Sequence, residues 1–258
     1  MNIEYTGGGD PARTLALLWR TAEAHGRRGA RGPKPGLTVD AIVSAATEIA
    51  DAEGLGALSL RAVAERLGVG TTSLYTYVPG KAELIDLMVD RAHGELPRPA
   101  ELAPGWRERL EAVAHARWDL VRRHPWLLQV AAASRPPLGP GVTDAYEHEL
   151  RAVDGIGLTD LEMDAVISLI AAFVHGVGRD AVEADQAERR TGMTDEQWWS
   201  AYGPLLAGVA NPARYPLGSR VGTAAGQTHG SAADPGHTFR FGLARILDGI
   251  AALLAGRP

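Results

Sequence analysis

LRAVAERLGVGTTSLYTYV, residues 60–78, is the stretch that decides the fold, because it reads as two short helices around a glycine turn. Gly68 stands where the first helix would end, and glycine takes the left-handed conformation required there without a Cβ penalty. Each helix also carries an apolar pair at i, i+4 spacing, Val63 with Leu67 and Leu74 with Val78. The stretch therefore predicts a helix-turn-helix whose apolar pairs hold the two helices together.

The outer face of the second helix is rich in hydroxyl groups. Its side chains are Thr71, Thr72, Ser73, Tyr75, Thr76 and Tyr77. Hydroxyl side chains suit base edges and phosphates in a major groove, whereas an ordinary surface helix would carry Glu and Lys. The pattern favours DNA as the partner of this helix.

These residues resemble the TetR-type bacterial transcriptional regulators, and the resemblance spans residues 37–96. It includes the opening helix TVDAIVSAATEIADAEGL, then LSLRAVAERLGV, the junction SLYTYVPGKAEL and the helix that continues through Leu84, Leu87 and Met88, all in order. The resemblance implies an all-α fold, with an N-terminal three-helix helix-turn-helix domain and a larger C-terminal helical bundle that carries dimerisation helices. It also implies a homodimeric repressor that binds double-stranded operator DNA and a small-molecule effector.

The resemblance assigns roles to single residues as well. It places Thr71, Thr72, Ser73, Thr76 and Tyr77 at bases or nearby phosphates. It places Tyr75 and Lys81 on the DNA backbone, with Arg61 close to it. Relatives often carry larger aromatic or His side chains at the positions of Thr76 and Tyr77, so the division between base and phosphate contacts stays open there.

Length and composition fit a soluble regulator. A chain of 258 residues with 45% hydrophobic residues favours two domains and can bury a sizeable core. We expect an N-terminal extension over 1–36, a DNA-binding domain over 37–96 and a ligand-binding and dimerisation domain over 97–258. No cysteine is present, no apolar run approaches the roughly 20 residues that span a bilayer, and the N-terminus lacks a signal pattern. We therefore expect a cytoplasmic protein.

Charge is unevenly distributed along a chain whose net charge is −5. The stretch before the first helix of the DNA-binding unit holds Arg20, Arg27, Arg28, Arg31 and Lys34 against the single acid Glu23. Acids outnumber bases from residue 37 to residue 92. A basic arm that contacts phosphate through Arg28, Arg31 and Lys34 would supply the attraction that the acidic unit lacks. A solvated Gly/Arg leader explains the same composition equally well.

An extra short helix is expected ahead of this arm, over 11–25. Asp10 followed by Pro11 is an N-cap and a favoured first helical residue, and Leu15, Leu18 and Trp19 lie on an apolar stripe. This helix could extend the DNA contact, fray, or dock on the DNA-binding domain. Docking is favoured, because Leu18 and Trp19 would otherwise be exposed together.

The remainder reads as helices separated by Pro and Gly. We expect helices near 105–123, 125–133, 141–155, 159–190, 195–210 and 238–255. Residues 212–236 have too little apolar content to pack and are expected to form a mobile loop. Dimerisation is expected to use the helices around 167–181 and 239–254, where Gly176 and Gly178 would permit close approach or mark a kink.

Aromatic and polar residues in the C-terminal body could line an effector pocket. The candidates are His115, Trp118, Arg122, Trp126, Phe173, His175, Trp198, Trp199 and Tyr202. An apolar or ring-bearing molecule near Trp118 and Phe173 would suit such a lining, although plain core packing is the commoner role of each residue. No metal or other cofactor is expected, because a lone His is usually a satisfied hydrogen-bonding group.

Two other functions are conceivable from the sequence, an enzyme and a regulator without a small-molecule ligand. An enzyme finds little support, since the chain lacks GxSxG, GxxxxGK[ST] and GxGxxG motifs, and His148 and Glu149 lack the second histidine of HExxH because position 152 is Ala152. A regulator with a closed C-terminal bundle, responding to a protein partner or to no ligand, remains the alternative. A filled bundle would favour that alternative.

Overall fold

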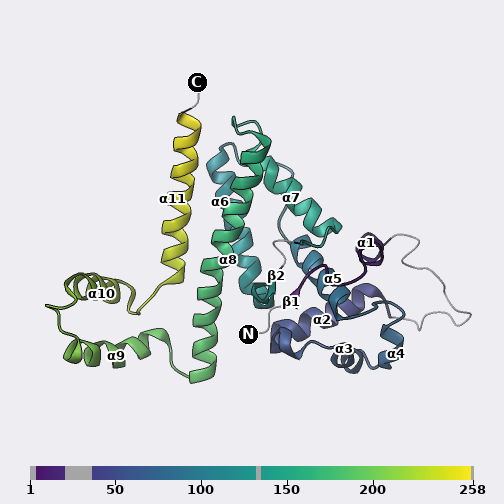
Figure 1. Cartoon of the computed structure of the whole chain (residues 1–258), viewed down its shortest axis with the longest axis horizontal. Helices are drawn as coiled ribbons and strands as arrows, with labels where there is room; N and C mark the ends of the chain where they lie inside the picture. The colour runs from purple at the N-terminus through teal and green to yellow at the C-terminus, as the bar shows by residue number, and fades with distance from the viewer. Residues whose placement is uncertain (1–3, 21–36, 132–134, 257–258) are drawn as a thin grey trace, which may run out of the picture. The chain divides into compact units, whose positions relative to one another are not determined.

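The computed structural model describes residues 4–20, 37–131 and 135–256, and most of these residues are helical (Figure 1). The chain divides into two compact units, Met1–Ala171 and Ala172–Pro258. The all-α prediction is confirmed. Neither boundary between the three predicted domains falls at this division, and the predicted domains stay a prediction.

Four helices build the predicted DNA-reading unit: α2 (Val39–Glu53), α3 (Leu60–Arg66), α4 (Thr71–Leu74) and α5 (Lys81–Gly94), with the short 3-10 helix η1 (Leu55–Ala57) after α2. Ser59 caps α3 by accepting a hydrogen bond from the Ala62 amide. Gly68 ends that helix with a φ of 65°, and Val63, Leu74 and Val78 are fully buried. The helix-turn-helix prediction is therefore confirmed.

The N-terminal segment folds back onto this unit. The helix α1 (Pro11–Leu18) packs against α5, and its Leu17 and Leu18 are buried. Asp10 caps it by accepting from the Arg13 amide. Docking is thus confirmed, while the described helix ends at Leu18, earlier than expected.

A two-stranded parallel pair also ties the N-terminus to unit 1. The strand β1 (Glu4–Tyr5) pairs with β2 (Val130–Ala131), with Glu4 opposite Val130. The helix expected over 125–133 is therefore wrong beyond its start. The chain forms the 3-10 helix η2 (Pro125–Gln129) and then extends, because β2 must offer its backbone to β1.

Unit 1 also contains α6 (Trp106–Arg123) and α7 (Pro140–Val153), and α7 packs against both α5 and α6. Glycine permits the approach of α7 to α5: a Cβ on Gly141 would lie 2.0 Å from the Asp90 carbonyl oxygen. The start of α7 is thereby held against the C-terminal half of α5.

The long helix α8 (Asp160–Thr191) runs through the division between the units. Its most apolar 18-residue window has a mean hydropathy of 1.5, so by length and composition α8 could cross a membrane. The expectation that no apolar run approaches that length is wrong here, because residues 165–178 carry no Asp, Glu, Lys or Arg. Within the structure, 33% of this window is buried. A single helix of this kind is weak evidence for a membrane span, because core helices of soluble proteins can have the same length and composition.

Unit 2 contains the end of α8 with α9 (Asp195–Val209), α10 (Pro216–His229) and α11 (Pro235–Ala255). The helix α10 contradicts the expected loop over 212–236. Pro216 begins it and Gly230 ends it in the left-handed conformation, while a Cβ on Gly226 would lie 2.6 Å from the Trp199 indole nitrogen. The helix packs through glycine against an aromatic ring, so its low apolar content misled the prediction.

Candidate functional site

The hydroxyl-bearing face of the helix-turn-helix is accessible. Thr72 and Thr76 are exposed and Tyr75 is 51% exposed, whereas Thr71, Ser73 and Tyr77 are partly buried. The Thr76 hydroxyl donates to the Ser73 carbonyl at 2.7 Å, which fixes its orientation and leaves its oxygen able to accept. The structure thus presents Thr72, Tyr75 and Thr76 to solvent most fully.

The cations near this face differ in setting. The Arg61 guanidinium donates to Glu65 at 2.8 Å. This hydrogen bond and the negative charge of Glu65 raise the pKa of Arg61 above its ordinary value. Lys81 opens α5 and is partly buried. Arg28, Arg31 and Lys34 of the expected basic arm lie outside the described residues.

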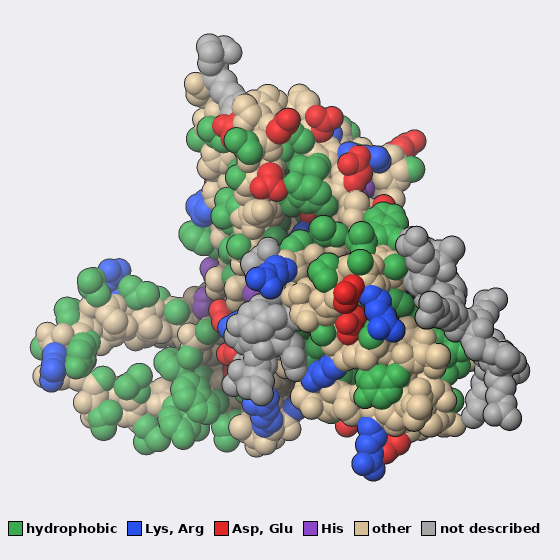
Figure 2. All heavy atoms as spheres, turned by 45° about the vertical axis from the view of Figure 1, so that its right-hand side comes forward, with side chains coloured by type: hydrophobic (Ala, Val, Ile, Leu, Met, Phe, Trp, Pro, Cys, Tyr) green, Lys and Arg blue, Asp and Glu red, His purple; other side chains and the backbone are tan. Residues whose placement is uncertain are grey.

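The acids of the reading unit contribute less negative surface than the sequence count suggests. Glu83, Asp86 and Asp90 on α5 are buried. Others form ion pairs, Glu65 with Arg61, Glu48 with Arg66 and Asp40 with Arg20. Figure 2 shows Lys and Arg side chains interspersed with Asp and Glu rather than one acidic field. Phosphate approach is therefore opposed less than the sequence implied.

The N-terminal segment and the start of α7 both contact buried acids of α5. We term these contacts the strap junction, which comprises Gly7, Asp86, Asp90 and Val142. The Gly7 amide donates to Asp86 at 3.1 Å, and the Val142 amide donates to Asp90 at 2.9 Å. Burial raises the pKa of both carboxyl groups, against the opposing effect of these hydrogen bonds. The Trp19 indole further donates to the Leu138 carbonyl at 2.8 Å.

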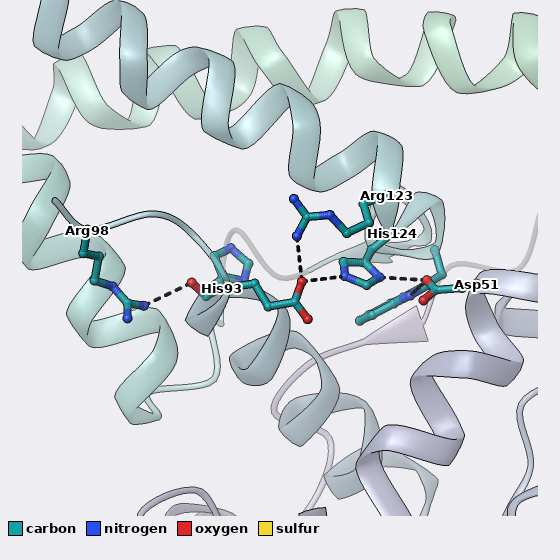
Figure 3. A network of polar contacts seen from close by, with 7 residues as sticks. Asp51, His93, Arg98, Arg123 and His124 are labelled. Carbon is teal, nitrogen blue, oxygen red and sulfur yellow. Dashed lines mark hydrogen bonds and ion pairs between the residues drawn. The ribbon is translucent and has the colours of Figure 1, made fainter.

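A second cluster, which we term the histidine junction, joins α2, the end of α5 and the end of α6 (Figure 3). His124 is buried and contacts Asp51 through Nδ1 at 2.8 Å and Glu95 through Nε2 at 3.0 Å. Arg123 donates to Glu95 at 2.8 Å, and the Trp126 indole donates to Asp51 at 2.8 Å. Burial alone would raise the pKa of Glu95, but the hydrogen bonds and charges of His124 and Arg123 lower it overall.

Four of the nine predicted ligand residues lie in unit 1. His115, Trp118 and Arg122 are on α6, where Trp118 is buried. Trp126 is fully buried and bonded to Asp51, so it serves the core and the histidine junction. None of the nine lines the cavity described below.

The other five lie in unit 2. Phe173 stacks on Phe239 with ring centroids 6.0 Å apart. Burial, with the positive charge of Arg179, lowers the pKa of His175. On α9, Trp198 stacks on Tyr202 at 4.7 Å and lies 6.3 Å from Trp199. The ligand-binding role of all nine residues stays a prediction.

A cavity of about 140 Å³ opens between α6, α7 and the turn from Leu96 to Ala103. Its walls are largely apolar and include four ionisable side chains, Arg98, Arg109, His148 and Glu149. None of these four residues is among the predicted ligand residues, because that prediction rests mainly on aromatic side chains. In the sequence, His148 and Glu149 stand out only as an incomplete HExxH motif.

Two protein-family models match the chain. The model described as bacterial regulatory proteins of the tetR family matches residues 42–88. The model described as the tetracyclin repressor-like C-terminal domain matches residues 98–254. Together they cover the helix-turn-helix and most of the helical body.

Individual relatives point to the same family as these models. The chain is 50% identical over 257 residues to the HTH-type transcriptional repressor DrrR1 of Streptomyces coeruleorubidus, covering 99% of this chain and 91% of that protein. The TetR family protein ActR of Streptomyces coelicolor, solved in complex with actinorhodin, is similar with a TM-score of 0.69 and 28% identity, over 85% of this chain and 97% of ActR. BioQ, solved with its double-stranded DNA operator, is similar with a TM-score of 0.50 and 26% identity, over 60% of this chain and 93% of BioQ.

Proposed function

From the premise that this chain belongs to the TetR family of bacterial regulatory proteins, and is thus a DNA-binding transcriptional regulator rather than an enzyme, we propose how it works. It acts as a cytoplasmic homodimeric repressor that leaves its operator when a small apolar or ring-bearing effector binds the C-terminal body. The single observation that carries this proposal is the exposed hydroxyl face of a correctly built helix-turn-helix.

The proposed DNA contacts divide by chemistry. Thr71, Thr72, Ser73, Thr76 and Tyr77 face bases or nearby phosphates. Tyr75, Lys81 and Arg61 contact the DNA backbone. Contacts to phosphate from hydroxyl groups and cations position the protein without reading the base sequence. The exposure of Thr72, Tyr75 and Thr76 leaves these side chains accessible to DNA, and BioQ is a similar protein that was solved with its double-stranded DNA operator.

The test substitutes Thr72 or Thr76 by Ala. Loss of a base contact should cost about 1–3 kcal/mol at one operator position and relax sequence preference there. Binding is measured by fluorescence anisotropy across a panel of operator variants, with Thr223→Ala, an exposed threonine of α10, as the matched control. Unchanged preference in both Thr72→Ala and Thr76→Ala would refute the assignment.

The basic arm supplies phosphate attraction in this proposal. Replacing Arg28, Arg31 and Lys34 together by Gln should weaken operator binding and make its salt dependence shallower, because fewer counterions are released. Substitution is a cleaner test than deleting residues 1–34, since deletion would also remove the contacts of Gly7 and Leu18 with α5. An unchanged salt slope would leave the arm without a role in binding.

An effector and a dimer complete the proposal. The cavity beside α6 and α7 argues against a filled bundle, and ActR is a ligand-bound relative. Dimerisation through 167–181 and 239–254 would cover apolar side chains that are now exposed, including Leu169, Phe241 and Leu253. The effector must prefer a dimer whose recognition helices no longer match major grooves about 34–36 Å apart.

A further inference from the structure

The cavity between α6, α7 and the 96–103 turn combines an apolar lining with two arginines, Arg98 and Arg109. Ten of its lining residues are apolar: Leu96, Pro97, Pro99, Leu102, Ala103, Ala112, Val113, Ala116, Ala145 and Ala152. Its volume of about 140 Å³ resembles that of an engineered cavity of about 150 Å³ known to admit benzene. The space therefore fits a single ring.

The one carboxylate in the lining is already neutralised. Glu149 is buried and accepts two hydrogen bonds from Arg117, at 2.7 Å from Nε and 2.6 Å from Nη2. This bidentate pair satisfies the geometry that arginine and carboxylate prefer. Burial lowers the pKa of His148, assisted by the positive charges of Arg151 and Arg98 and opposed by the charge of Glu149. This shift favours the neutral imidazole.

The two remaining cations have no carboxylate partner among the described residues. Arg98 is exposed and donates to the backbone carbonyls of His93 and Gly141, each at 3.1 Å, so its charge faces water and no carboxylate holds it (Figure 3 shows the first of these bonds). Arg109, on the first turns of α6, has its Nε buried with no hydrogen-bond partner in the part of the chain that the structure describes. A buried donor of this kind is uncommon and calls for an acceptor.

We propose that this cavity binds the acidic group of a ring-sized organic anion, with a carboxylate or phenolate on Arg109 and the ring against the apolar walls. The anion supplies the acceptor that the Arg109 Nε lacks and offsets the charge of Arg98. Arginine suits this role because its planar fork can hold a carboxylate through two donors. This inference rests on the proposed function, since it names the chemical class of the effector.

The position of the cavity gives the anion a route to the reading unit. The turn that lines it begins at Leu96, directly after Glu95 of the histidine junction. An occupant that shifts this turn moves a residue hydrogen-bonded to His124, which also contacts Asp51 at the end of α2. Such a ligand can bias two arrangements of the reading unit only through different affinities for them.

The test titrates the full-length protein with 4-fluorobenzoate and, separately, with the neutral 4-fluorobenzamide, followed by fluorine NMR. The benzoate should bind saturably and at least about tenfold more tightly than the amide, because hydrogen bonds to charged groups are stronger. Arg109→Met should remove about this tenfold preference, weakening benzoate binding more than amide binding. Arg107→Met, on the same helix but outside the lining, is the matched control.

Two further variants secure the result. Arg109→Lys should bind the benzoate with intermediate strength, because the charge stays and the fork is lost. Ala116→Leu should exclude both probes by filling the ring space. Equal binding of acid and amide, or benzoate binding unchanged in Arg109→Met and Ala116→Leu proteins whose thermal unfolding matches the parent, would overturn the proposal.

Operator binding without any probe separates this inference from the proposed function. If the parent protein binds its operator but shows no preference for the benzoate, the inference about the effector class fails alone. If the benzoate binds as expected and no operator sequence is recognised in preference to unrelated DNA, the repressor proposal fails and the site remains.

Discussion

The two junctions that hold α5 in unit 1 use opposite chemistry. At the strap junction, Asp86 and Asp90 are buried and accept hydrogen bonds from backbone amides. At the histidine junction, Glu95 and Asp51 are about one-third exposed and face His124 and, for Glu95, Arg123. One junction thus relies on neutral dipoles and the other on charged side chains.

The difference shows in the direction of the pKa shifts. Burial raises the pKa of Asp86 and Asp90 because amide donors do not fully replace water around a carboxylate. Glu95 has a lowered pKa because its hydrogen bonds and charge interactions with His124 and Arg123 outweigh its partial burial. The strap junction therefore tolerates protonation, whereas the histidine junction depends on ionised groups.

Among variants of the two junctions, His124→Ala is expected to lower the free energy of unfolding most. This variant leaves the Asp51 and Glu95 carboxylates without their shared partner and removes a ring that packs 5.9 Å from Trp126. Breaking a fully buried pair costs about 3–5 kcal/mol, and the partial exposure of both carboxylates reduces this to about 2–3 kcal/mol. The measurement is urea unfolding at fixed protein concentration and pH 7.

Arg123→Gln is the matched control for this variant. Arg123 shares Glu95 with His124, but its side chain is 53% exposed, so its loss should cost less than about 1 kcal/mol. Equal destabilisation by His124→Ala and Arg123→Gln would mean that the buried imidazole has no special place in the junction.

At the strap junction, Asp86→Ala is expected to lower the free energy of unfolding by less than His124→Ala does. The variant leaves the Gly7 amide without its acceptor, which costs about 1–2 kcal/mol, but it also removes a carboxylate that is costly to bury. Asp86→Asn keeps an acceptor oxygen and should stay within about 1 kcal/mol of the parent. Urea unfolding measures both, and a larger loss for Asp86→Ala than for His124→Ala would reverse the ranking of the two junctions.

The contrast between these regions also explains what the sequence could predict. The helix-turn-helix depends on local signals, the i, i+4 apolar pairs and the left-handed Gly68, and both are visible in a short stretch. Docking of α1 was predictable, because Leu18 would otherwise be exposed to solvent. The pairing of β1 with β2 was not predictable, because a two-residue strand has no sequence pattern of its own.

The non-local features escaped prediction for a physical reason. The histidine junction joins Asp51, Glu95 and His124 from three helices, and no spacing rule connects them. The cavity depends equally on the packing of α7 against α6. The helix α10 was missed because it packs through Gly226, whereas the prediction required large apolar side chains. The DNA-contacting residues stay predictions until binding is measured.

The smallest effect, and the sharpest separation of the two junctions, is expected in the pH dependence of stability. Asp86 has a folded pKa above its ordinary value of 3.8, so its contribution is fully present below that value and is lost as pH rises through the raised pKa. Glu95 has a folded pKa below its ordinary value of 4.5, so its contribution is present above 4.5 and is lost as pH falls through the lowered pKa.

Relative to Asp86→Asn, the parent should therefore become more stable as pH falls from 7 towards 4. Relative to Glu95→Gln, the parent should lose its advantage below about pH 4.5. Urea unfolding of the three proteins between about pH 3 and pH 7 gives both differences. Slopes of the same sign would show that backbone amides and cations hold these carboxylates in equivalent ways, and the distinction between the junctions would then fail.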